Sequence, residues 1–295
     1  MSIKFLQMRL PQGRKKAFTI SYDDGVRQDQ RLLDLMKKYG IRGTFNLNSG
    51  LLGRKEMAVI DGFETDISTF EADEIREMYQ GQEIACHALT HMSLAGTPTA
   101  LISWQIIEDR KNLESLTDGL VQGFAYPFGT YDDAVKSTLQ ACGIYYARTV
   151  NSTGIFDFPK DYLEWQPTCH HNDKNLKKLL ETFCRDERLW GEPQLFYLWG
   201  HAYEFDQRDN WEMIEEAFSY VVRYKDDIWM ATNGEIYDYV KAYENLQFSA
   251  DGSKVYNPGL LDVWIGVDQD SIEVPGGAMI TIQSKEENNH GNFSG

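Results

Sequence analysis

Short apolar runs alternate with longer amphipathic stretches over most of this chain. The run AFTISY (17–22) precedes QRLLDLMKKYG (30–40), whose apolar positions follow a helical period up to a terminal glycine, and GTFNLN (43–48) comes next. This order predicts a strand, a helix and a second strand. A βαβ unit of this kind places its two strands parallel in one sheet.

The same alternation continues to about residue 245. Further strands are predicted at 82–86, 123–126, 144–150, 195–200 and 227–231, and further helices at about 71–80, 99–116, 132–141, 174–185, 209–224 and 234–243. Each strand is followed by a helix, which predicts an α/β fold with a parallel sheet. With this number of strands we expect the sheet to close into an irregular barrel.

Three other segments have a different texture. Residues 151–173 lack a sustained period and are long for a connection, so we expect a functional loop that walls a binding site. From residue 246 short β runs are broken by Asp-Gly, Asn-Pro and Pro-Gly-Gly turns. We therefore predict a barrel domain over 1–245, a small β appendage over 246–283 and a disordered tail over 284–295.

Charge and composition limit the partners. The 295 residues include 29 Lys and Arg against 45 Asp and Glu, a net charge of −16, which repels nucleic acid and anionic membranes. The N-terminus lacks a secretory apolar region, and no apolar run approaches the ~18 residues that span a bilayer. We expect a soluble cytoplasmic protein whose cysteines, without C-x-x-C spacing, are reduced thiols, although an exported protein with its signal removed would look the same. The oligomeric state stays open.

Polar side chains follow several of the predicted strands. Because the carboxyl ends of parallel strands line one crevice, these residues are candidates for a common site. They are Asp23 and Asp24 after the first strand, His87 and His91 after the third, Tyr126 to Gly129 after the fourth, Arg148 near the end of the fifth and His201 after the sixth.

The histidines and aspartates fit a metal hydrolase. If the segment after its strand turns helically, His87 and His91 lie on one face within reach of one ion. Asp24 adds an anionic ligand and leaves coordination open for water and substrate. Adjacent aspartates on an extended strand point to opposite sides, so Asp23 is free for another task. The alternatives are two ordinary histidines and a simple Asp-Asp-Gly turn. A two-histidine, one-carboxylate set also suits iron oxygenases, but the βα alternation is wrong for their usual all-β barrels.

Four motifs taken together resemble a known family. SYDDG (21–25), GQEIACHALTH (81–91), FAYPFG (124–129) and LWGH (198–201) are similar to the NodB-homology polysaccharide deacetylases, carbohydrate esterase family 4, over about 15–245. The resemblance implies a distorted (β/α)7 barrel. It also implies metal-dependent removal of acetyl groups from N-acetylated saccharides, by attack of a metal-bound water on the acetyl carbonyl.

The resemblance assigns roles to the motif residues. Asp24, His87 and His91 are implied as ligands of a divalent metal, Zn²⁺ first, with Co²⁺, Mn²⁺ or Ni²⁺ as alternatives. Asp23 is implied as the general base and His201 as the general acid. The backbone N–H of Phe128 is implied in oxyanion stabilisation, and we expect Tyr126, Phe128 and Trp165 to contact substrate. An acetylated saccharide is the expected partner; O-acetyl esters, a small non-sugar amide or silent carbohydrate binding are the alternatives.

Two departures from the family leave residues unassigned. The arginine that usually begins the third motif is Ala125 here, and we propose Arg148 as its substitute, the alternative being an ordinary ion pair at the rim. The fourth motif is matched loosely by DYLEW, so whether Asp161 or Glu164 tunes His201 stays open. The consecutive His170 and His171 should diverge, which favours histidines lining a polar pocket over a second metal site.

Overall fold

The computed structural model describes residues 5–117, 119–186 and 191–282, and its centre is a curled parallel sheet. The order of strands is β8 (Tyr146–Arg148), β7 (Gly123–Ala125), β6 (Glu83–Cys86), β3 (Thr44–Leu47), β2 (Lys16–Asp23), β10 (Gln194–Gly200) and β9 (Cys169–His170), with β11 (Ile228–Met230) also beside β2. All seven predicted strands are present, which confirms the α/β fold with a distorted (β/α)7 barrel.

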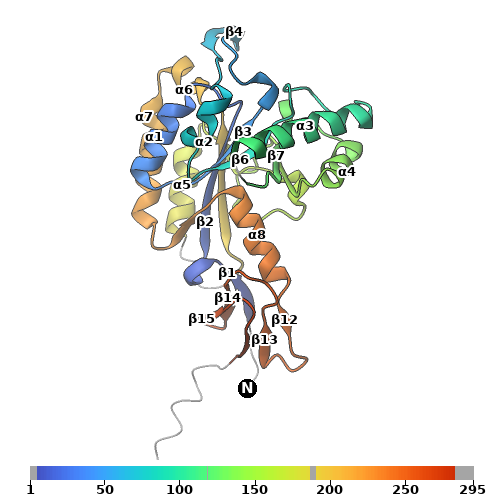
Figure 1. Cartoon of the computed structure of the whole chain (residues 1–295). Coiled ribbons are helices and arrows are strands. Elements are labelled where there is room, and N and C mark those ends of the chain that lie inside the picture. Colours follow the sequence, from blue (N-terminus) through green and yellow to red (C-terminus); the bar gives the residue numbers. More distant parts are fainter. Residues whose placement is uncertain (1–4, 118, 187–190, 283–295) are drawn as a thin grey trace, which may run out of the picture.

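Helices cover the outside of this sheet (Figure 1). They are α1 (Asp29–Tyr39), α2 (Ile75–Met78), α3 (Thr99–Thr117), α4 (Asp133–Ala141), α5 (Leu176–Arg185), α6 (Tyr203–Arg208), α7 (Trp211–Val221) and α8 (Asn233–Glu244). Every residue of β2 is buried, as expected of a strand covered on both faces. The described helices include none that is long and apolar enough to cross a membrane.

The long segment 151–173 contributes to the barrel wall. Trp165 bridges Arg148 in parallel, with its N–H donating to Ala147 O at 3.0 Å. A few residues later Thr168 N–H donates to Tyr197 O at 2.8 Å, and β9 pairs with β10. The segment therefore contacts β8 at one end of the sheet order and β10 near the other, a role that its aperiodic sequence did not predict.

Some elements differ from the predictions. The helix expected at 71–80 is a 3-10 turn over Ala72–Glu74 followed by the single-turn α2. The helix expected at 209–224 begins later, as α7, and the short α6 precedes it. An antiparallel hairpin of β4 (Met57–Ile60) and β5 (Phe63–Asp66) rises at the top of Figure 1. Both its strands are largely exposed, so no apolar alternation marks them.

The C-terminal β structure is present and recruits the start of the chain. It comprises β12 (Gln247–Phe248), β13 (Lys254–Tyr256) and β16 (Met279–Thr281) in one sheet, and β14 (Val263–Val267) and β15 (Asp270–Val274) in another. The second sheet also contains β1 (Leu6–Arg9), antiparallel to β14. Residues 6–9 were assigned to the barrel domain and instead pair with the appendage. The predicted tail 284–295 lies outside the described residues.

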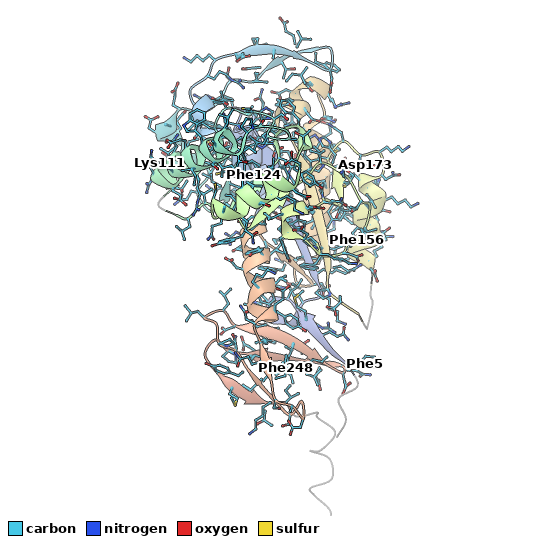
Figure 2. All side chains as sticks on the ribbon, turned by 90° about the vertical axis from the view of Figure 1, so that its right-hand side faces the viewer. Phe5, Lys111, Phe124, Phe156, Asp173 and Phe248 are labelled. Atoms are coloured by element: carbon cyan, nitrogen blue, oxygen red, sulfur yellow. The ribbon has the colours of Figure 1, made fainter. Side chains whose placement is uncertain are left out.

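The appendage lies at the amino end of the barrel strands. Tyr239 of α8 fixes it there, because its hydroxyl donates to Arg9 O at 2.7 Å and accepts from Trp264 N–H at 2.9 Å. Figures 1 and 2 show it as a lower lobe, which includes Phe5 and Phe248. The opposite rim, where β2 ends, is left free for the polar residues of the strand ends.

Candidate active site

The predicted residues converge at the carboxyl rim of the barrel. Asp23 is the last residue of β2, Arg148 is the last of β8, and His87 and His201 directly follow β6 and β10. Asp23 Oδ2 lies 3.9 Å from His87 Nε2 and 3.8 Å from His201 Nε2. Residues far apart in sequence thus form one cluster around a buried carboxylate.

Asp24, His87 and His91 form a set of donors suited to one cation. Asp24 Oδ1 is 3.6 Å from Nε2 of each histidine, and the donor atoms all lie within 4.8 Å of one another. His87 Nδ1 donates to Ala125 O at 2.8 Å; because a carbonyl only accepts, the proton is on Nδ1 and the Nε2 lone pair faces Asp24. This donor set fits a divalent metal.

The backbone of this rim is left-handed at several non-glycine residues. They are Asp24 (φ 77°), Ala88 (φ 61°), His91 (φ 54°) and Phe128 (φ 59°). Such conformations cost on the order of 1–3 kcal/mol each and persist only where the surroundings fix them. His87 and His91 therefore meet through a tight turn, with His91 N–H donating to Ala88 O at 3.4 Å. The expected helical turn is wrong.

Asp23 lies in a strongly cationic environment. Arg148 Nη2 donates to its Oδ2, and Asn46 Nδ2 donates to its Oδ1 at 2.8 Å. Burial alone raises the pKa of this carboxyl, but Arg148, His87 and His201 outweigh burial and lower the pKa to about 2. Asp23 is consequently ionised at neutral pH.

Arg148 reaches the site from the strand beside Ala125. The two residues are register partners in β8 and β7, so the guanidinium starts one strand away from the usual motif position. It is fully buried, donates to Thr149 O at 3.1 Å and lies 4.3 Å from the centre of the Trp199 ring. These contacts direct it at Asp23 rather than at solvent.

His201 is paired with an acid that the sequence analysis missed. Its Nδ1 lies 2.7 Å from Glu204 Oε1. Burial lowers the pKa of His201, but the bond to Glu204 and the charges of Asp24 and Asp23 raise it to about 9. The signal in the sequence was the spacing of three residues, which brings side chains together on a helix.

The acids of DYLEW lie elsewhere. Asp161 accepts from Lys136 Nζ at 2.6 Å, and Glu164 also accepts from Lys136. Both acids are exposed in part and bind this lysine at the outer wall. The expectation that Asp161 or Glu164 tunes His201 is therefore wrong, and Glu204 is the acid that pairs with it.

The aromatic candidates divide into one exposed ring and two buried ones. Phe128 is 66% exposed, and its ring meets His91 edge-on at 4.6 Å. Tyr126 is 1% exposed and donates to Leu163 O at 2.8 Å. Trp165 is also 1% exposed and packs against Tyr197 in the barrel core. The side chains of Tyr126 and Trp165 are therefore not accessible to substrate, which corrects the expectation for both.

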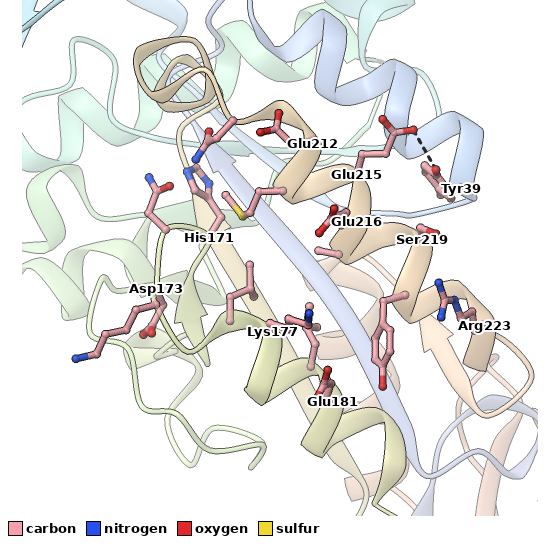
Figure 3. A pocket seen from close by; sticks show the side chains of 18 residues that line it. Tyr39, His171, Asp173, Lys177, Glu181, Glu212, Glu215, Glu216, Ser219 and Arg223 are labelled. Atoms are coloured by element: carbon pink, nitrogen blue, oxygen red, sulfur yellow. Dashed lines mark hydrogen bonds between the residues drawn. The ribbon is translucent and has the colours of Figure 1, made fainter.

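His170 and His171 do not diverge as expected. Both Nε2 atoms approach Glu204, at 3.2 Å from Oε1 and 3.4 Å from Oε2 respectively. They form a second group of possible metal donors with Glu204. His171 also lines the inner end of a groove of about 880 Å³ between α5 and α7, with Glu212, Lys177 and Arg223 further along it (Figure 3).

Part of the chain matches a known protein family. Residues 11–147 match the family model of polysaccharide deacetylases. No curated protein matches the chain. A candidate polysaccharide deacetylase from Mycobacterium smegmatis has a similar fold, with 17% identity, 81% of this chain and 94% of that chain covered, and a TM-score of 0.57.

Two further solved structures have lower TM-scores. The family 4 carbohydrate esterase from Streptomyces lividans, in complex with acetate, is 14% identical over 74% of this chain and 93% of that chain, with a TM-score of 0.47. The Streptococcus pyogenes deacetylase PplD, in complex with acetate, is 18% identical over 50% of this chain, with a TM-score of 0.42. The chain spans 61% of PplD.

Proposed function

We propose that the chain, whose residues 11–147 match the family model of polysaccharide deacetylases, is a metal-dependent hydrolase that removes acetyl groups from N-acetylated saccharides. One observation carries the proposal: a three-donor set lies beside an ionised carboxylate, Asp23, whose Oδ2 is 3.9 Å from His87 Nε2 of that set and 3.8 Å from Nε2 of a protonated imidazole, His201. A base and an acid held in opposite charge states beside a cation site are what amide hydrolysis requires.

Asp24, His87 and His91 would hold the metal. Nitrogen and oxygen donors of this kind suit Zn²⁺ and also accept Co²⁺, Mn²⁺ or Ni²⁺. When bound, the ion supplies Lewis acidity, which polarises an acyl oxygen and lowers the pKa of water. The backbone of Phe128, next to His91, is the proposed donor to the developing oxyanion.

Asp23 is the proposed general base. Arg148 and Asn46 orient its two oxygens, and its pKa of about 2 keeps it free to accept a proton at neutral pH. His201 is the proposed general acid, because its raised pKa leaves a proton on the imidazole for the departing amine. Asp23 would accept a proton from the attacking water. His201 would give its own proton to the nitrogen of the departing amine.

The test is acetate release by the Zn²⁺-loaded full chain. The panel should contain chito-oligosaccharides, peptidoglycan fragments, acetylated monosaccharides, acetylxylan as an O-acetyl ester and small acetamides. We expect release from at least one N-acetylated saccharide, its loss with a chelator and its recovery on adding Zn²⁺. Asp34→Ala, an exposed acid on α1, is the matched control for Asp24→Ala. Release only from esters or small amides, or from nothing at full metal occupancy, would refute the assignment.

A further inference from the structure

We propose that His170 and His171 are positioning residues that hold Glu204 against His201 through their Nε2–H groups, and that they do not form a second metal site. The proposal rests on the proposed function, in which His201 is the general acid. It concerns His170, the last residue of β9, and His171 directly after it, to which the site described above gives no role.

Glu204 is the shared partner of every group in this cluster. Its side chain is 13% exposed and is approached by His201 Nδ1 at 2.7 Å, His170 Nε2 at 3.2 Å and His171 Nε2 at 3.4 Å. Asn172 Nδ2 also donates to its Oε2. Each of these neighbours can supply an N–H, and a carboxylate surrounded by N–H donors is held in its ionised form.

The proton position on His170 decides between a donor and a metal ligand. The backbone N–H of Asn172 donates to His170 Nδ1 at 3.1 Å. A ring nitrogen that accepts a hydrogen bond carries no proton, so the proton of the neutral ring is on Nε2. Nε2 therefore donates to Glu204 and offers no lone pair to a cation, which is the reverse of His87.

His171 follows the same logic through Tyr22. Its Nδ1 lies 3.0 Å from the Tyr22 hydroxyl, and among the described residues the hydroxyl forms its hydrogen bond with this nitrogen. If the hydroxyl accepted, a bare Nε2 would face the Glu204 carboxylate and repel it. The hydroxyl therefore donates, and the proton is on Nε2, which lies 3.4 Å from Oε2 in an electrostatic contact rather than a well-aligned hydrogen bond. Burial lowers the pKa of His171 to about 4, so the ring stays neutral.

The fold is built to admit this ring. A Cβ on Gly200 would lie 2.1 Å from His171 Nδ1, so any other residue at the end of β10 would displace the imidazole. Phe205 stacks on the ring at 4.3 Å between ring centres. The position of His171 is thus fixed by close packing against Gly200 and Phe205.

The consequence for His201 is one of orientation and charge. Glu204 Oε1 holds Nδ1, which leaves Nε2 3.8 Å from Asp23 and facing the reaction site. The other titratable groups that act on His201 are Asp24 directly after β2, Asp29 at the start of α1, His91 in the turn after β6, and Tyr203, which stacks on it at 5.0 Å. Without its histidine contacts Glu204 is no longer fixed beside His201 Nδ1, so the pairing of the two side chains weakens while these other groups stay in place.

The test compares His170→Leu with His170→Gln in the Zn²⁺-loaded full chain. The glutamine amide can replace the Nε2–H donor, whereas leucine keeps bulk without it. We expect His170→Leu to reduce kcat about tenfold with KM unchanged and to move the alkaline limb of the pH–rate profile to lower pH, because the Glu204 carboxylate is no longer fixed against His201 Nδ1 and pairs with it less closely. His170→Gln should restore both, and Lys174→Ala, an exposed neighbour, should change neither.

Two readouts do not depend on activity. Nitrogen-15 spectra of labelled histidines should show His170 and His171 protonated at Nε2, and metal analysis should give one tight Zn²⁺ per chain. Protonation at Nδ1, a second tight Zn²⁺ lost in His170→Leu, or an unchanged His201 titration in His170→Leu would overturn the proposal. If no acetylated substrate is cleaved, the proposed function fails, while these spectra still test the cluster. His170 is partly exposed, so its variants remain informative even if those of buried His171 do not fold.

Discussion

Removing the Arg148 guanidinium tests how the base is kept ionised. In Arg148→Ala, Asp23 loses its buried cationic partner while the burial that raises its pKa remains. Since the pKa of Asp23 is lowered from 3.8 to about 2, the group contributes stability above about pH 4 that is lost as the pH falls through 2. This lowering of the Asp23 pKa corresponds to about 2.5 kcal/mol of folding stability, at 1.36 kcal/mol per pKa unit.

An internal reference gives the expected size of the change. Asp109 is also buried, accepts hydrogen bonds from Ser49 and His87 N–H groups, and has a pKa raised by burial to about 6. Without Arg148 we expect the pKa of Asp23 to move toward that value, opposed by the bound metal. The acidic limb of the pH–rate profile should therefore rise by on the order of two units or more.

The assay is a pH–rate profile of the Zn²⁺-loaded protein, with unfolding in urea measured in parallel at pH 7. An unpaired buried carboxylate should reduce the free energy of unfolding by roughly 3–5 kcal/mol. Ala125→Arg in the Arg148→Ala background should restore the limb at least partly, because the two positions are adjacent in register. Arg223→Ala, in the groove between α5 and α7, is the control. An acidic limb that stays in place would mean that the metal alone keeps Asp23 ionised.

Further predictions concern the metal ligands, the base and the acid. Alanine at any one of the three proposed ligands should abolish stoichiometric metal binding and activity together, and a variant that keeps its metal by elemental analysis would remove that residue from the set. Asp23→Asn should keep the metal and lose turnover by about 10²–10⁴, the usual contribution of general acid–base catalysis, measured as kcat. Glu204→Gln should lower the pKa of His201 from about 9 and shift the alkaline limb of the pH–rate profile to lower pH, since the bond to Glu204 raises that pKa. An alkaline limb that does not move would show that Glu204 does not set the pKa of the proposed acid.

The sequence predicted the barrel well because its strands are buried on both faces. Runs such as the one that forms β2 leave a continuous apolar signal that exposed elements lack. The hairpin β4–β5 is exposed and left no such signal. The pairing of β1 with β14 joins residues about as far apart as the described chain allows, and no local pattern encodes it.

The sequence predicted the residues of the proposed metal site and missed the carboxylate that pairs with the proposed acid. Asp24, His87 and His91 follow strands, so the rule for strand ends brought them together. Glu204 stands three residues after His201, between the predicted strand 195–200 and the predicted helix 209–224, where no helix is predicted. In the structure α6 begins at Tyr203, and this one turn of helix brings Glu204 back to the imidazole.

The left-handed residues explain why motif letters alone could not give the site geometry. The backbone φ is positive at the non-glycine residues Asp24, Ala88, His91 and Phe128. The residue type does not predict this conformation. Each is held by contacts from another strand or turn: Asp24 N–H, for example, donates to Asn46 O on β3 at 3.0 Å. The strain is thus balanced by the folded barrel as a whole. The rim keeps its donors converged only while β2, β3, β6 and β7 remain in register, so the sequence names the ligands and tertiary packing sets their geometry.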